Sequence, residues 1–143
     1  MKFNMDESLG FILNRTAIAS KGSFNKLIKS YGISPEQWSV IFRVVQKSKI
    51  SQKELADSTY KDQGNLTRMI DKLVEKAYLH RKLHETDRRS VELLATDKSK
   101  SLVENIIPIS SLYNEQLTKN FSEDDKLKLI ELLNRVYNNI QKV

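Results

Sequence analysis

The sequence predicts a mainly α-helical fold of the α+β class, in which a short pair of strands follows a cluster of helices. Apolar residues recur at helical spacing over most of the chain, and only two short runs have the composition of strands. Four glycines and two prolines interrupt 143 residues, which favours long helices over a many-stranded sandwich. The order short helix, turn, longer helix and strand pair over residues 51–96 predicts a winged helix-turn-helix lobe.

The N-terminal part is expected to form two helices. Apolar residues at near-helical spacing predict a long amphipathic helix over residues 6–30, which a break at Gly32 would end. The next helix would start at Ser34, because serine caps helices, proline is favoured at the first helical position, and Gln37 can bond back to the amide of the cap. An apolar stripe that begins at Trp38 indicates that this second helix is buried on one face.

The middle of the chain predicts two helices separated by a turn. Residues 47–51 form a short connection, after which Ser51 and Glu54 make a capping box and start a helix over about residues 51–58. Asp62 would cap the following helix. The apolar residues of that helix fall at i, i+3, i+4, i+7, i+8 and i+11 and predict one continuous buried face: Leu66, Met69, Ile70, Leu73, Val74 and Ala77.

The C-terminal part is expected to form a hairpin and two further helices. Residues 78–84 and 90–95 have the composition of short strands joined by a charged loop. A long helix follows, and Pro108 is expected to kink it, because proline removes an amide hydrogen and crowds the preceding turn. Ser122 opens a last amphipathic helix that continues to the C-terminus.

Basic charge is concentrated in the predicted winged lobe. The chain has a formal net charge of +6, and residues 38–96 carry 12 Lys and Arg against 8 Asp and Glu. The residues before this segment carry five basic and three acidic side chains, and those after it carry seven of each. The excess coincides with the helix-turn-helix pattern, as attraction to the phosphates of double-stranded DNA requires. A solvated basic face would not predict that coincidence.

The longer helix of the pair has the position of a recognition helix, whose first turns enter the major groove. Gln and Asn can bond to adenine edges and Arg to guanine, while glycine lets the backbone approach closely. The candidates for the major groove are Gln63, Gly64, Asn65, Thr67 and Arg68, and the candidates for backbone phosphates are Lys61, Lys72 and Lys76. The alternative for each is simple solvation, because every surface helix has a polar face.

The charged loop of the hairpin offers a second contact with DNA. Arg88 and Arg89 stand beside Asp87. An arginine is attracted to the negative potential of a narrow minor groove, and a neighbouring carboxylate can restrict its side chain before binding. The alternative is an ordinary charged turn with a surface ion pair of small energy. The location of the hairpin after the recognition helix favours the contact with DNA.

Several other classes of protein and site find little support. The absence of cysteine excludes disulfides and thiolate-ligated metals. His80 and His84 stand four residues apart but have no third ligand, so neither a metal site nor a cofactor is expected. We see no glycine-rich phosphate loop and no nucleophile paired with a base, so we do not expect an enzyme. The alternative that stays open is a winged-helix module for protein–protein contact, or an antiregulator without specific DNA binding.

The sequence also indicates where the protein acts and in what state. No apolar run is long enough to span a membrane and the N-terminus lacks an export pattern, so we expect a cytoplasmic protein. Long amphipathic helices at both ends must bury their stripes on their own lobe or on a second copy. A bundle shared across a two-fold axis uses both ends and matches palindromic DNA half-sites, which predicts a homodimer.

Three stretches resemble the multiple-antibiotic-resistance regulator (MarR) family. Residues 50–56 are similar to its helix before the turn, and residues 64–76 are similar to its recognition helix, where Thr67, Arg68 and Leu73 match the motif. The third stretch is similar to the wing signature of the family, Asp-x-Arg followed by Leu-Thr, and comprises Asp87, Arg89, Leu94 and Thr96. Two departures are Ala77, where the family usually has glycine, and Ala95, which separates the usual Leu and Thr.

The resemblance implies a single domain over residues 1–143, with a helical dimerisation region from residues 1–33 and 97–143 and a DNA-binding lobe from residues 34–96. It implies a triangular homodimer that acts as a repressor on a pseudo-palindromic operator. It also implies that Arg89 enters the minor groove and that Asp87 orients the Arg89 side chain.

The resemblance also implies a cleft for a small-molecule effector between the dimerisation helices and the lobe. Tyr31, Trp38 and Phe42 are aromatic candidates for it, and Arg43 could pair with an anionic effector. The alternatives are a place in the core for the three aromatic residues and solvation for Arg43.

Overall fold

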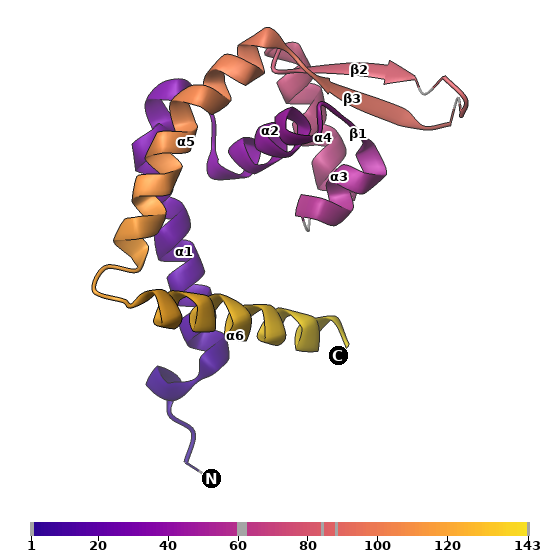
Figure 1. Cartoon of the computed structure of the whole chain (residues 1–143). Coiled ribbons are helices and arrows are strands. Elements are labelled where there is room, and N and C mark those ends of the chain that lie inside the picture. The colour runs from indigo at the N-terminus through magenta and orange to yellow at the C-terminus, as the bar shows by residue number, and fades with distance from the viewer. Residues whose placement is uncertain (1, 60–62, 84, 88, 143) are drawn as a thin grey trace. The chain divides into compact units, whose positions relative to one another are not determined.

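The computed structural model describes residues 2–59, 63–83, 85–87 and 89–142, without the side chain of Gln63 (Figure 1). The chain consists of two compact units, Met1–Ile109 and Ser110–Val143. Its elements in order are η1 (Met5–Glu7), α1 (Leu9–Ile28), η2 (Lys29–Tyr31), α2 (Pro35–Lys47), β1 (Lys49–Ser51), α3 (Gln52–Thr59), α4 (Gln63–Glu75), β2 (Leu79–Leu83), β3 (Val91–Ala95), α5 (Asp97–Leu117) and α6 (Glu123–Gln141).

The two N-terminal helical segments lie where the sequence predicts them, and the second begins with the expected capping chemistry. The helix predicted over residues 6–30 is divided into η1, α1 and η2, and Gly32 ends the last of them with a φ of +73°. At α2 the expected capping box is complete. The backbone amide of Gln37 donates to the Ser34 hydroxyl over 3.2 Å, and the amide of Ser34 donates to the Gln37 side chain over 3.0 Å.

A three-stranded antiparallel sheet completes the lobe, with the strand order β1-β3-β2. The strands predicted over residues 78–84 and 90–95 correspond to β2 and β3. The expectation of a plain connection over residues 47–51 was wrong, because Lys49–Ser51 forms β1 and pairs with Glu92–Leu94 of β3. Three residues are too few to display strand alternation, so this strand depends on its pairing partner.

The core of the first unit lies where α2, α3, α4 and the sheet meet. Leu66, Ile70 and Leu73 of α4 are fully buried, as the apolar periodicity predicts. The stripe ends earlier than expected, because α4 stops at Glu75 and Ala77 is exposed in the following turn with a φ of +64°. Ala77 therefore belongs to the end of the helix and not to its buried face.

The second unit contains the end of α5 and the whole of α6. The helix α5 continues through Pro108, and the Ser122 hydroxyl caps α6 by accepting from the amide of Asp125 over 3.0 Å. The helix α6 carries an apolar stripe, yet none of its residues is buried. Among the described residues, no helix is both long and apolar enough to cross a membrane.

Candidate nucleic-acid interface

The burial of α4 determines which of its side chains face outward. Its apolar face is directed into the lobe, so Gly64, Asn65, Thr67 and Arg68 are all exposed along its first turns. The helix begins at Gln63, whose side chain lies outside the described part of the chain. The fold therefore presents four of the five predicted major-groove residues on one exposed face.

Two of these residues are already joined within the helix, and the predicted phosphate contacts are placed further along it. The Arg68 guanidinium donates to the Asn65 side-chain oxygen. Lys72 is exposed in the last turn. Lys76 is exposed just beyond it, where its ammonium donates to the backbone oxygen of Gly32 over 3.4 Å. Lys61, Asp62, His84 and Arg88, which the sequence analysis also named, lie outside the described residues.

Two contacts that the sequence analysis did not identify join α4 to its neighbours. The Arg81 guanidinium of β2 lies 2.6 Å from the Asp71 carboxylate, which connects the middle of α4 to the wing strand. The Gln52 side-chain amide donates to the Thr67 hydroxyl over 2.8 Å, which connects α4 to the start of α3. Both contacts join residues of different elements, so helical periodicity carries no signal for them.

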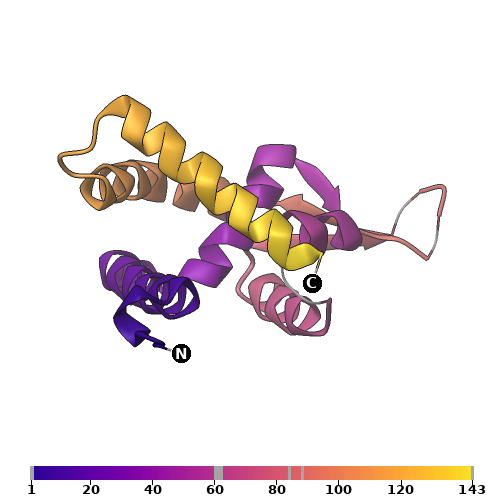
Figure 2. The same ribbon diagram turned by 90° about the horizontal axis from the view of Figure 1, so that it is seen from below.

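The hairpin of β2 and β3 projects away from the helices of the lobe, as Figures 1 and 2 show from two directions. At its tip the Asp87 carboxylate accepts a hydrogen bond from the backbone amide of Arg89 over 3.0 Å. The amide of Ser90 donates to the backbone oxygen of Asp87, also over 3.0 Å. An aspartate that bonds to the amide two residues on makes a local turn. Asp87 thus restricts the backbone that carries the Arg89 side chain.

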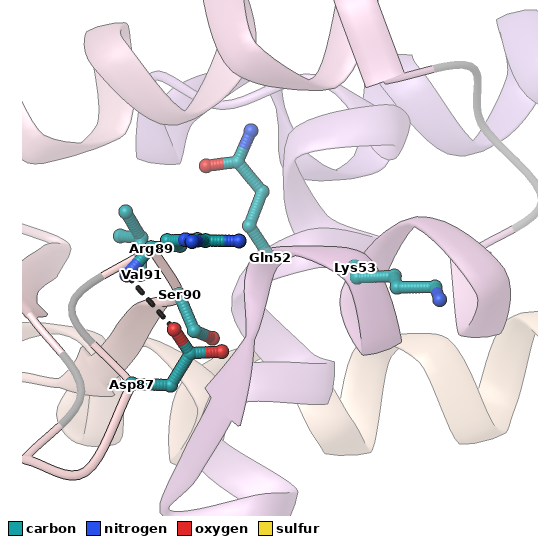
Figure 3. A pocket seen from close by; sticks show the side chains of 6 residues that line it. All are labelled: Gln52, Lys53, Asp87, Arg89, Ser90 and Val91. Atoms are coloured by element: carbon teal, nitrogen blue, oxygen red, sulfur yellow. Dashed lines mark hydrogen bonds between the residues drawn. The ribbon is translucent and has the colours of Figure 1, made fainter.

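The wing loop that leads into β3 and the start of α3 share an open pocket of about 430 Å³. Figure 3 shows its lining and the Arg89 side chain, which extends from the wing toward the start of α3, while Lys53 points away along the helix. The pocket is lined by Gln52, Lys53, Asp87, Arg89, Ser90 and Val91. Basic and hydrogen-bonding side chains from two separate elements therefore meet at one surface.

The residues named for an effector cleft lie in η2 and α2. The rings of Trp38 and Phe42 have centroids 5.5 Å apart and are tilted by 45°. Both rings and Tyr31 are half-buried, and the Arg43 guanidinium donates to the Gln46 side chain over 3.3 Å. Neither the pocket in Figure 3 nor a second one beside β1 is lined by any of these residues.

The chain is similar in sequence to known regulators. A model of the MarR family matches residues 33–91. The HTH-type transcriptional regulator MhqR of Bacillus subtilis (strain 168) is 27% identical over 128 residues, which are 90% of this chain and 88% of that protein. The HTH-type transcriptional regulator SarZ of Staphylococcus epidermidis is 28% identical over 121 residues, which are 83% of this chain and 80% of that protein.

Solved structures share the whole fold. A mutant of MarR from E. coli, solved in complex with operator DNA, is 26% identical and has a TM-score of 0.85 over 95% of this chain and 98% of that one. The fold of Bordetella bronchiseptica BpsR is also similar, with a TM-score of 0.89 at 19% identity over 96% of this chain and 98% of that one. The similarity covers the winged lobe and the terminal helices alike.

Proposed function

We propose, from the premise that this chain belongs to the MarR family, that it is a sequence-specific DNA-binding transcriptional regulator. It acts as a homodimer on a pseudo-palindromic operator, as a repressor. The observation that carries the proposal is the exposed polar start of α4 in the same lobe as a projecting wing (Figure 1). Arg89 lies in the loop of that wing, between β2 and β3. A recognition helix and a basic wing that belong to one lobe can enter neighbouring grooves of one duplex.

Each side chain has a proposed role. Arg68 and Thr67 contact base edges in the major groove, and Arg89 enters the minor groove from a backbone that Asp87 restricts. The remaining candidates for the major groove are Gln63, Gly64 and Asn65, those for phosphates are Lys61, Lys72 and Lys76, and Arg88 is a further candidate on the wing. The excess of basic residues over residues 38–96 supports this arrangement, because phosphate neutralisation supplies most of the non-specific affinity for DNA.

The homodimer is supported by apolar side chains on the terminal helices. Ile18 of α1 is 63% exposed, and Leu127 and Ile130 of α6 are 65% and 58% exposed. Each of the two helices thus leaves large apolar side chains in water, and exposed apolar surface of this kind marks sites of protein association. Residues 1–33 and 97–143 would therefore form the dimerisation region, and residues 34–96 would form the DNA-binding lobe. Two lobes related by a two-fold axis match an inverted repeat in DNA.

The effector is a separate proposal. A small aromatic or anionic molecule would bind near Tyr31, Trp38, Phe42 and Arg43. The half-buried rings could stack on an aromatic molecule, and the Arg43 guanidinium could pair with its charge. Such a ligand would release DNA if it bound more tightly to a form of the dimer whose lobes are spaced wrongly for the operator.

The test of the proposed function is a DNA-binding titration against sequences that the purified protein selects from a random pool. Arg89→Ala should weaken binding about ten- to hundredfold for each half-site, the range for losing one arginine contact. Arg68→Ala should weaken binding and also relax the preference for bases. Lys26→Ala, which removes one positive charge from α1, is the matched control and should change affinity little.

The dependence on salt separates the proposal from its alternative. A DNA-binding protein should lose affinity steeply as salt rises, and Lys72→Ala should reduce that slope by about one per subunit, which is about two for the dimer. A winged-helix module that contacts only proteins would select no sequence from the pool. Equal affinity of the wild type and Arg89→Ala would contradict the role of the wing.

A further inference from the structure

The start of α3 carries a side chain that the assigned DNA contacts do not include. Gln52 is the first residue of α3, and its amide nitrogen lies 2.8 Å from the hydroxyl oxygen of Thr67. Thr67 is exposed on the face of α4 that is proposed to meet the major groove. The bond therefore joins the first helix of the helix-turn-helix to a base-contacting residue of the second.

The backbone at Gln52 is held from both sides. Ser51 is the last residue of β1 and pairs with Glu92 of β3, which is a strand of the wing. The Ser51 hydroxyl also accepts from the amide of Glu54 over 3.0 Å, which fixes the first turn of α3. Gln52 further lines the pocket that Arg89 lines from the wing (Figure 3). The side-chain amide of Gln52 thus connects Thr67 to the paired strands β1 and β3, of which β3 also forms the wing.

The bond has a consequence for the conformation of Thr67. Threonine in a helix divides between two rotamers of its first side-chain torsion, and rotation from one to the other moves both the hydroxyl and the methyl group to new positions. A donor fixed at Gln52 favours the rotamer that directs the hydroxyl toward α3. The two groups make different contacts with DNA, because the methyl packs on thymine methyl groups and the hydroxyl forms hydrogen bonds. A fixed rotamer therefore presents one defined pattern to the duplex.

We propose that Gln52 is a positioning residue for sequence recognition, which selects the Thr67 rotamer and so sharpens the preference for the base pair that Thr67 faces. This inference rests on the proposed DNA-binding function. It concerns discrimination between sequences, whereas the lysine contacts concern affinity for all sequences.

The experiment is a double-mutant cycle in which base preference is measured by selection from a random DNA pool and by titration of the selected sites. Gln52→Met keeps the length of the side chain and its high helix propensity, but it removes the amide donor. It should reduce discrimination about three- to tenfold at one base pair per half-site, the range expected for one hydrogen bond. The remaining positions and the thermal midpoint should be unchanged.

The background at position 67 decides whether the effect passes through Thr67. With Thr67→Ser, which keeps the acceptor, Gln52→Met should still reduce discrimination. With Thr67→Val, which removes the acceptor, Gln52→Met should have no further effect. Lys53→Ala is the neighbouring control, because it removes an exposed charge from the same turn and should lower affinity for all sequences equally.

Two results would overturn the inference, and they are distinguishable from failure of the proposed function. If Gln52→Met reduced discrimination between sequences as much in the Thr67→Val background as in the wild type, Gln52 would not act through Thr67. An equal loss of affinity for every sequence would make Gln52 a general backbone contact. In both cases the wild type would still select an operator. A wild type that selects no sequence would instead overturn the proposed function, and this inference with it.

Discussion

The helices α4 and α6 have the same kind of apolar pattern but differ in what it contacts. Leu66 and Leu73 of α4 are fully buried by other residues of the same lobe. In α6 the corresponding side chains are open, with Leu127 65% and Ile140 56% exposed. Helical periodicity therefore identifies a face that needs a partner, but it does not say whether the same chain supplies that partner.

The difference has an energetic meaning. Burying apolar surface contributes roughly 25 cal/mol per Å², so a helix that leaves its stripe in water gives up most of that stabilisation. The lobe obtains this stabilisation when the chain folds. The helix α6 would obtain it when a second copy binds, so its stability should depend on protein concentration.

The largest expected effect is that of truncating a buried residue of α4. Leu73→Ala should lower the free energy of unfolding by about 2–5 kcal/mol, because it removes buried methyl groups and leaves a cavity. Urea denaturation measures the change. The loss should be the same at every protein concentration at which the dimer is fully formed.

The matched variant in α6 is Ile130→Ala, at a residue that is 58% exposed. It should shift the monomer–dimer equilibrium in sedimentation or light scattering, while the unfolding of the diluted monomer changes by less than about 0.5 kcal/mol. A large concentration-independent loss of stability from Ile130→Ala would contradict the comparison, since it would show that α6 is packed by its own chain.

The features that the sequence predicts are those set by neighbours along the chain. The capping box of Ser34 and Gln37 depends on residues three apart, and so does the hydrogen bond that the Glu54 amide donates to the Ser51 hydroxyl. The buried face of α4 follows likewise from its periodicity. Local chemistry and repeated spacing therefore sufficed for most helix starts and for the outward face of the candidate recognition helix.

The features that the sequence did not predict depend on contacts between distant residues. The strand β1 exists because Lys49–Ser51 meets β3 more than 40 residues later. The ion pair of Asp71 with Arg81 and the bond of Gln52 with Thr67 likewise join separate elements. Neither composition nor period marks such pairs, because many other polar residues of the lobe have the same charge or hydrogen-bonding capacity.

The turn at the end of α4 leads to a prediction with a smaller effect on stability than that of Leu73→Ala. The amide of Tyr78 donates to the Leu73 oxygen over 2.9 Å and that of Ala77 to the Val74 oxygen over 3.0 Å, which is the Schellman pattern. That pattern places Ala77 at a φ of +64°, where an L side chain is strained. Glycine adopts this conformation freely.

Ala77→Gly should therefore raise the free energy of unfolding by about 0.5–1 kcal/mol, because relief of the strain exceeds the added entropy of the unfolded chain. Ala19→Gly is the control. It lies exposed within α1 and should lower the stability by about 1 kcal/mol. If both substitutions destabilised the protein equally, the turn after α4 would not be strained by its side chain.

The smallest effect concerns the ion pair between Lys21 of α1 and Glu36 in the first turn of α2. Partial burial acts to raise the pKa of Glu36, but the Lys21 ammonium and the hydrogen bonds to the backbone and Ser34 outweigh it, so the pKa lies below its ordinary value of 4.5. A carboxylate with a lowered pKa stabilises the folded state above the unfolded pKa, and this contribution is lost as the pH falls through the folded pKa.

Glu36→Gln should thus cost about 0.5 kcal/mol at pH 7 and progressively less as the pH falls below 4.5 toward the folded pKa, measured by urea denaturation across the acid range. Glu123→Gln removes the corresponding charge from the first turn of α6, where its side chain is 83% exposed, and should change stability even less. A loss for Glu36→Gln that is constant with pH would assign its effect to packing instead of charge. Either way the loss of stability stays far below that of Leu73→Ala. Burial of apolar side chains contributes much more to the free energy of unfolding than one partly exposed ion pair does.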